Sequence, residues 1–361
     1  MADDVYKKLA KVLDTLPNGF PPSPTGAEIK LLKKIFEPEE AELFCDLRLK
    51  FETPEQIAQR TGRPLEGLDE MLTRMWKKGQ IFGVDFGTTR VFKMMPWAFG
   101  IYEFQIDRMD REFAELCEEY NPVYGVQFFN TKPALMQVVP VKADIPAVQE
   151  ALPYESVSKI IEAGQSFAVN DCICKKERRL LDKGCDKPLE VCMGIAPAPG
   201  VFENYHWGRV ISKEEAYQVL QKAEEAGLVH LSGNYQNGQF FICNCCGCCC
   251  GVLQGLNQLN LPLSKVVNSH FFATIDPDQC VACGVCADER CQVRAIEEGE
   301  DFYRVLEDRC IGCGLCLSTC PSEAVTLHRR PDSQWDLPPE NEDEWFEQRA
   351  KNRGVDYSPY R

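Results

Sequence analysis

The chain has 361 residues, enough for two or three domains, and 44% of them are hydrophobic, which excludes general disorder. Its net charge of −15 disfavours binding to nucleic acid, whose phosphates need lysine and arginine. The 20 cysteines lie in tight groups, unlike those of a disulfide scaffold. No apolar stretch predicts a secretion signal or a transmembrane segment, so we expect a cytoplasmic protein whose thiols stay reduced.

Residues 1–100 are predicted to form a winged-helix-like docking domain. Helix patterns occur in four segments, 27–36, 38–47, 53–62 and 64–78. Thr53 and Pro54 make a good helix start, because threonine caps the helix and proline fits its first position. A β-hairpin is predicted over 81–92. Helices followed by a two-stranded wing are the order of a winged-helix domain.

The candidate recognition helix over 64–78 argues against DNA binding. Its acidic and basic residues balance: Glu66, Asp69, Glu70, Arg74, Lys77 and Lys78. The acidic ones fall in the first turns, where a recognition helix normally meets bases. Because a helix without a basic face lacks the electrostatic attraction to phosphate, we expect this domain to dock onto a protein partner.

Residues 101–272 are predicted to form a cysteine-rich, mixed α/β domain, with two groups of cysteines, ten in all, between residues 172 and 250. A strand is expected over 166–169, and a helix is expected to begin after Ser212 and to end at Gly227. Two further strands are expected over 228–231 and 240–242. This order would bring the second group of cysteines beside the first.

The first group in this domain predicts a third [4Fe–4S] cluster. Its members are Cys172, Cys174, Cys185 and Cys192. A Cys-x-Cys pair can ligate two corners of a cluster, and the glycines and proline near the other two cysteines would let their loops fold back. Zinc is the alternative metal.

The second group is a run of six cysteines in eight residues: Cys243, Cys245, Cys246, Cys248, Cys249 and Cys250. They cannot all face one cube, because neighbouring side chains diverge in a strand or a helix. Three or four of them would bind a further iron–sulfur cluster while the others pack as small apolar residues. Two alternatives remain open: one multi-iron centre shared by both groups, or a zinc site with leftover buried thiols.

Residues 273–328 contain a repeat of cysteine motifs. Each half has three cysteines at two-residue gaps followed by a fourth. Since a cube needs four ligands, the fourth comes from the other half of the repeat. The first [4Fe–4S] cluster is therefore assigned to Cys280, Cys283, Cys286 and Cys320. The second is assigned to Cys310, Cys313, Cys316 and Cys291.

This repeat resembles the bacterial two-cluster ferredoxin family, and the resemblance implies one-electron transfer. Four residues separate Cys286 from Cys291 where the family has three, and Gln292 replaces the usual proline. We expect a longer loop before Cys291. Two zinc knuckles are the alternative. With its upstream motifs, the chain resembles anaerobic bacterial multi-cysteine iron–sulfur proteins that have a winged-helix-like N-terminal domain.

Residues 329–361 are predicted to form an extended tail that lies across the chain or a partner. The tail contains several aromatic residues, whereas disordered linkers are usually poor in them. The predicted fold class is thus α+β and multidomain, with the tail after the ferredoxin-like module. Glycine-rich loops of the flavin- or nucleotide-binding type are absent from the sequence.

The sequence therefore predicts an iron–sulfur electron-transfer protein or subunit. It would pass single electrons between a donor and a partner oxidoreductase, within a larger complex and without catalysis of its own. One alternative is an oxidoreductase with a catalytic cluster in the middle domain. The other alternative is a redox-sensing, DNA-binding regulator.

Overall fold

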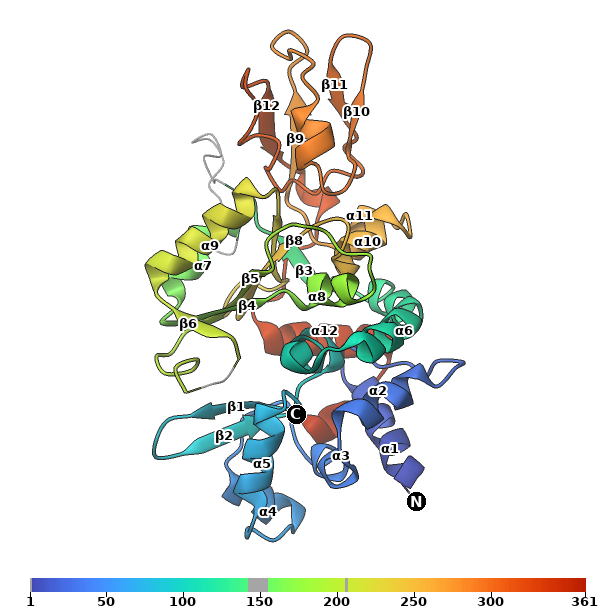
Figure 1. Ribbon diagram of the computed structural model, residues 1–361, viewed down its shortest axis with the longest axis vertical. Coiled ribbons are helices and arrows are strands. Elements are labelled where there is room, and N and C mark those ends of the chain that lie inside the picture. The colour runs from blue at the N-terminus through green and yellow to red at the C-terminus, as the bar shows by residue number, and fades with distance from the viewer. Residues whose placement is uncertain (1, 142–154, 205–206) are drawn as a thin grey trace.

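The computed structural model describes residues 2–141, 155–204 and 207–361, which form three regions along one long axis (Figure 1). Short helices and a hairpin lie at one end, a six-stranded sheet lies in the middle, and two small sheets lie at the other end. One core of buried side chains extends from Val5 to Leu327, so the regions pack against one another. Within the described ranges, every helix is too short or too polar to cross a lipid bilayer.

The N-terminal region largely follows the predicted elements. The helices expected at 27–36, 38–47 and 53–62 and the hairpin are confirmed, while the winged-helix assignment stays a prediction. The next helix begins at Leu68, because Gly67 before it has a left-handed φ of 75°. The first helix was not expected. The elements are α1 (Ala2–Thr15), α2 (Ala27–Ile35), α3 (Pro38–Phe44), α4 (Pro54–Thr61), α5 (Leu68–Lys77), β1 (Phe82–Asp85) and β2 (Arg90–Lys93).

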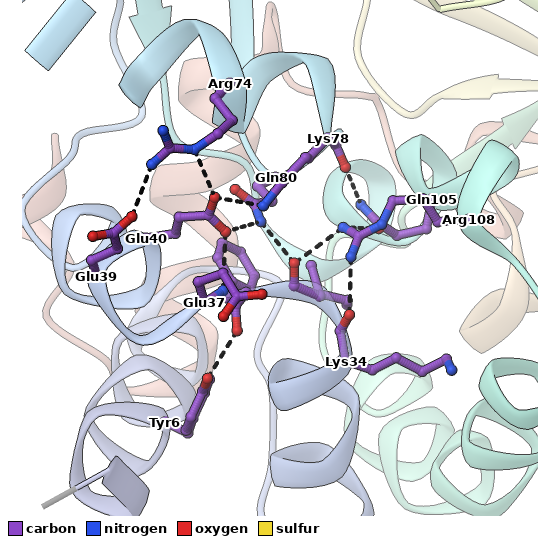
Figure 2. Close-up of polar contacts among 12 residues, drawn as sticks. Tyr6, Lys34, Glu37, Glu39, Glu40, Arg74, Lys78, Gln80, Gln105 and Arg108 are labelled. Atoms are coloured by element: carbon purple, nitrogen blue, oxygen red, sulfur yellow. Dashed lines mark hydrogen bonds and ion pairs between the residues drawn. The ribbon is translucent and has the colours of Figure 1, made fainter. Parts of the chain in front are cut away.

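Glu40 on α3 is the buried centre of the polar contacts between these helices (Figure 2). Its carboxylate accepts hydrogen bonds from Lys78 and Gln80, each at 2.7 Å, and from Arg74 at 3.3 Å. Burial alone would raise the pKa of Glu40, but the hydrogen bonds, led by that from Lys78, outweigh it and lower the pKa. These bonds offset the cost of burying a carboxylate.

The middle region is built on an antiparallel sheet with the order β3-β7-β8-β5-β4-β6. The strands expected at 166–169, 228–231 and 240–242 and the helix after Ser212 are confirmed. The strands are β3 (Met136–Val138), β4 (Ser166–Asp171), β5 (Glu190–Ala196), β6 (Arg209–Ile211), β7 (Val229–Gly233) and β8 (Phe241–Cys245).

Helices cover both faces of this sheet (Figure 1). Helices α7 and α9 share a core with Met193 and Ile242 on one face. On the opposite face, Leu253 of α10 packs in a second core with Cys245. The elements of this region are η1 (Trp97–Ile101), η2 (Glu103–Arg108), α6 (Arg111–Phe129), α7 (Val157–Ala163), α8 (Ile173–Leu180), α9 (Lys213–Glu225), α10 (Gly251–Asn257) and α11 (Leu263–Val266).

The region that carries the cysteine repeat consists of two antiparallel strand pairs. Strand β9 (Phe271–Ile275) pairs with β12 (Val325–Arg329). Strand β10 (Ile296–Glu298) pairs with β11 (Tyr303–Val305). A short wide helical turn, η4 (Cys286–Arg290), lies before β10. Strand β9 precedes the cysteines of the first half and pairs with β12, which ends the second half. Strand β10 ends the first half and pairs with β11, which precedes the cysteines of the second half.

The C-terminal tail, which we expected to be extended, contains the helix α12 (Glu342–Arg353). The helix carries ordinary signals that the prediction overlooked, since Asn341 caps its first turn and Gly354 ends it with a φ of 68°. The tail also contains η5 (Asp332–Gln334) and η6 (Ser358–Tyr360). It lies across the chain, because the buried Arg349 donates to the backbone oxygens of Pro17, Phe128, Thr131 and Pro133.

Replacing Glu40 with alanine should lower the free energy of unfolding by about 3 kcal/mol, because the buried amide of Gln80 loses its carboxylate acceptor and two cations lose their partner. Urea or thermal unfolding of the full chain measures the loss. The matched control is Glu39→Ala. This neighbouring carboxylate is exposed, pairs with the same Arg74 at 2.9 Å, and should contribute less than about 1 kcal/mol. Equal losses in the two variants would contradict the role assigned to Glu40.

The contribution of Glu40 should also depend on pH. Its pKa is lower in the folded chain than its ordinary value of 4.5, so its charge stabilises the folded state above that value. This stabilisation is lost as the pH falls through the folded pKa. The stability difference between the wild type and Glu40→Gln should therefore shrink steadily below about pH 4.5. A constant difference from neutral to acidic pH would refute this dependence.

Candidate metal centres

The two halves of the repeat surround two cavities. One cavity is lined by Cys280, Cys283, Cys286 and Cys320. The other is lined by Cys291, Cys310, Cys313 and Cys316. These are the two sets that the repeat predicts. Most of the remaining lining residues are apolar, among them Ile275, Val285, Val293, Ile311 and Leu315, so each set of thiols faces a small apolar space.

Strand pairing explains why the fourth cysteine of each set comes from the other half. Val325 of β12 lies opposite Ile275 of β9, and this register carries Cys320 to the first cavity. Ile296 of β10 lies opposite Val305 of β11, and this register carries Cys291 to the second. Matching backbone bonds close the two sites, from Asp276 N to Ala324 O and from Leu306 N to Ala295 O, each at 2.8 Å.

The backbone around the cavities suits an iron–sulfur cluster. Gly312 has a φ of 60°, and a Cβ there would lie 2.2 Å from the carbonyl oxygen of Phe271. Amide groups point at the cysteine sulfurs of the cavities: Ala295 N donates to the Sγ of Cys291 at 3.1 Å. The amide of Ala273 donates to Cys310 Sγ at 3.4 Å. Hydrogen bonds to sulfur are one of the protein's means of tuning such clusters.

The extra residue before Cys291 widens a helical turn instead of forming a long open loop. The amide of Cys291 donates to the carbonyl oxygen of Cys286, five residues earlier, at 3.1 Å. This turn carries the buried Arg290, which donates to the last carbonyl oxygens of α9 at Glu224 and Glu225. The insertion therefore fastens the repeat to the middle region.

Gln292, where the family has proline, contacts the cysteine run of the middle region. Its side-chain oxygen accepts from the amide of Gly247 at 3.0 Å. Asn257 donates both to Gln292 O at 2.8 Å and to Gly247 O at 3.1 Å. Because Gln292 follows Cys291 and Gly247 lies between Cys246 and Cys248, these bonds join the second cavity to the middle cysteines.

The cysteines of the two cavities differ in solvent exposure, and charges in one cavity affect the pKa of a thiol in the other. Cys283 in the first cavity is exposed, whereas Cys310 and Cys316 in the second are buried. Burial raises the pKa of Cys313 to about 12 and that of Cys286 to about 11. Burial is the main cause that raises the pKa of Cys316, and the charge of Cys286 in the first cavity acts in the same direction. Because metal ligation needs thiolates, loading of these sites releases protons.

Four middle cysteines form one compact group. The Sγ atoms of Cys185, Cys246, Cys248 and Cys249 all lie within 4.8 Å of one another. The Sγ atom of Cys185 lies 3.8 Å from that of Cys246 and 3.7 Å from that of Cys249. The order of the cysteines along the chain predicts that Cys185 belongs with Cys172, Cys174 and Cys192, so the compact group joins members of both predicted groups.

The alternation of β8 separates a second set of thiols from the compact group. Cys243 and Cys245 pack in the core on the α10 face of the sheet, whereas Cys246 and Cys249 pack in the core on the α9 face. The set on the α10 face comprises Cys174, Cys192, Cys243, Cys245 and Cys250. Its members are electrostatic neighbours, because Cys192 raises the pKa of Cys243 and Cys250 interacts with Cys245.

Cys172 lies at the junction of the two sets. A hydrogen bond with Cys174 lowers the pKa of Cys172 to about 7, and the buried ammonium group of Lys175 acts in the same direction. Lys175 is fully buried and donates to the carbonyl oxygens of Pro188 at 2.9 Å and Asn244 at 3.2 Å. Lys175 could not be identified from the sequence, because a lysine on a helix is normally exposed.

Residues 273–327 match the family described as the 4Fe-4S dicluster domain. This match supports a ferredoxin-like iron–sulfur segment, and it covers all eight cysteines of the two cavities. No curated protein and no solved structure matches the chain. The middle cysteines, the N-terminal region and the tail lie outside the matched residues.

Replacing Gly312 with alanine should cost the protein about four iron atoms, because the new Cβ would collide with a backbone oxygen beside the second cavity. Iron analysis of anaerobically purified protein measures the loss. Gly354→Ala is the matched control, because this glycine also has a positive φ of 68° but open space around its Cβ position. It should lose about 1 kcal/mol of stability and no iron. Full iron content in Gly312→Ala would refute the assignment.

Proposed function

We propose that the chain transfers single electrons between a donor and a partner oxidoreductase through [4Fe–4S] clusters in its C-terminal cysteine repeat. The observation that carries the proposal is that two complete sets of four cysteines line two neighbouring cavities within the dicluster match. Bound clusters would supply one-electron chemistry without any bond formation in the protein. The cysteines would bind the clusters, and the glycines would leave room for the backbone to pass close to them. The amides of Ala273 and Ala295 donate hydrogen bonds to the sulfurs of the proposed ligands.

The difference in exposure gives this path a direction in space. Cys283 is exposed, so the first cavity is the place where an external redox partner would approach. The second cavity is more buried and adjoins the middle region through Gln292 and Gly247. We propose that electrons enter or leave at the first site and pass through the second toward the middle region.

A third cluster completes the proposed path. The thiols on the α10 face, Cys174, Cys192, Cys243, Cys245 and Cys250 with the adjacent Cys172, exceed the four ligands that a [4Fe–4S] cluster needs. The sulfur atoms of these thiols lie farther apart than those of the compact group. This wider spacing suits a multi-iron cluster better than a single ion. Buried Lys175 would offset part of the negative charge of such a site.

The N-terminal region is proposed to dock the chain onto its partner, in the cytoplasm, and not onto DNA. Basic residues near the candidate recognition helix are paired within the chain, since Arg74 and Lys78 bind Glu40. On the hairpin, Arg90 pairs with Asp69 at 3.0 Å. Each pair reduces the positive charge that could attract phosphate.

Replacing Cys283 or Cys313 with alanine should each remove about four iron atoms and one cluster's electron paramagnetic resonance signal. The double variant should retain only the iron of the middle region. Anaerobic iron and sulfide analysis with spectra of the reduced protein measures these losses. Cys45→Ala is the control, because Cys45 is buried in the N-terminal core among apolar residues and should hold no iron. Wild-type iron content in both single variants would refute the proposal.

A further inference from the structure

The compact group of middle cysteines has the dimensions of a site for one metal ion. Three of its sulfur–sulfur distances are 3.7 Å (Cys249 to Cys185), 3.8 Å (Cys185 to Cys246) and 3.8 Å (Cys248 to Cys249). Four thiolates arranged as a tetrahedron at about 2.3 Å from a zinc ion lie about 3.8 Å from one another. These three distances therefore match the edges of a zinc tetrahedron, and all four sulfurs lie within 4.8 Å of one another.

A [4Fe–4S] cube needs a wider arrangement. Its four cysteine sulfurs bind the outer corners of the cube and lie roughly 6 Å apart. The structure contains an internal comparison: among the described residues, the compact group alone brings three or more such ligand atoms within 4.8 Å of one another. The thiols that line the two cavities of the repeat are more widely spaced than this.

We propose that Cys185, Cys246, Cys248 and Cys249 bind a single zinc ion in a closed structural site. Four cysteine ligands leave no open position for a substrate, and zinc does not change its oxidation state under biological conditions. The site would thus lie beside the electron path and take no electron itself.

The proposed zinc ligands come from two separate segments of the chain, which the ion would hold together. Cys185 lies in the segment between α8 and β5, which has no helix or strand, and its backbone oxygen accepts from Arg179 at 2.9 Å. Cys246, Cys248 and Cys249 lie in the turn between β8 and α10. One ion would therefore tie the irregular segment to the end of the central sheet.

The same turn supports the second cavity of the repeat. Gly247, between two of the proposed ligands, donates to Gln292, the neighbour of Cys291. A Cβ on Gly247 would lie only 1.9 Å from the carbonyl oxygen of Gln292, so the two backbones are in close contact. Zinc would hold this turn in place and thereby fix the position of Cys291.

The charge of the site is partly compensated nearby. Four thiolates around one zinc ion carry a net charge of −2, which is costly to bury without a counter-charge. Lys175 donates to the carbonyl oxygens of Pro188 and Asn244, which lie close in sequence to Cys185 and Cys246. Its ammonium group is thus fixed between the two segments that carry the ligands.

Elemental analysis of the anaerobically purified full chain tests the proposal. We expect about one zinc ion per wild-type chain and none in the Cys246→Ser/Cys249→Ser double variant, with the iron content of the repeat retained. Cys283→Ala should show the opposite result, with iron lost and zinc kept. Cys45→Ala is the control for a buried cysteine outside all sites. Loss of iron instead of zinc in the double variant would overturn the proposal.

Zinc K-edge absorption of the wild type keeps the test decisive if the double variant fails to fold. Four sulfur ligands at about 2.3 Å would support the site, whereas zinc with nitrogen or oxygen ligands, or no zinc, would overturn it. A single iron atom in a tetrahedral site would also overturn the assignment to zinc.

The electron paramagnetic resonance signal of the second cluster should broaden when zinc is removed by a chelator, because Gln292 would lose its fixed partner. An unchanged signal would refute the supporting role.

Discussion

The register of antiparallel strands decides which thiols meet in this protein. A cluster or a metal ion needs four sulfur atoms in one place, and no single cysteine motif of the chain supplies them. The β9–β12 and β10–β11 pairs exchange the fourth cysteine between the halves of the repeat. In the middle region, the alternation of β8 sends Cys243 and Cys245 to one face of the sheet and leaves Cys246 for the other. A shift of one residue in these strands would separate the ligand sets.

The two departures from the ferredoxin pattern acquire a structural role at the boundary between regions. The extra residue before Cys291 forms a wide turn, and that turn presents Arg290 to the end of α9. Proline at position 292 would lack the side-chain oxygen that accepts from Gly247. A free ferredoxin has no neighbouring region to contact, whereas this repeat is fixed to a sheet that carries further thiols.

Buried charged side chains fix segments within the N-terminal and middle regions and attach the tail, and each has several partners. Glu40 joins the N-terminal helices, Arg349 attaches the tail to the first loop and to the end of α6, and Lys175 links the segments of the middle thiols. An unpaired buried charge would destabilise the chain, so these contacts specify one arrangement of the segments that they join. That rigidity would keep the spacing of the proposed redox centres fixed.

The sequence by itself determined the repeat, the two sets of four cysteines that line its cavities and most helices and strands, because cysteine spacing and hydrophobic periodicity are local properties. It also contained the signals of α12, which we overlooked at Asn341 and Gly354. Only the tertiary structure decided how the ten middle cysteines divide, since Cys185 meets Cys246 and Cys249 across 61 and 64 residues. Sulfur–sulfur distances distinguish a site for one metal ion from a site for an iron–sulfur cube. These distances depend on strand register and loop packing. No spacing along the chain encodes them.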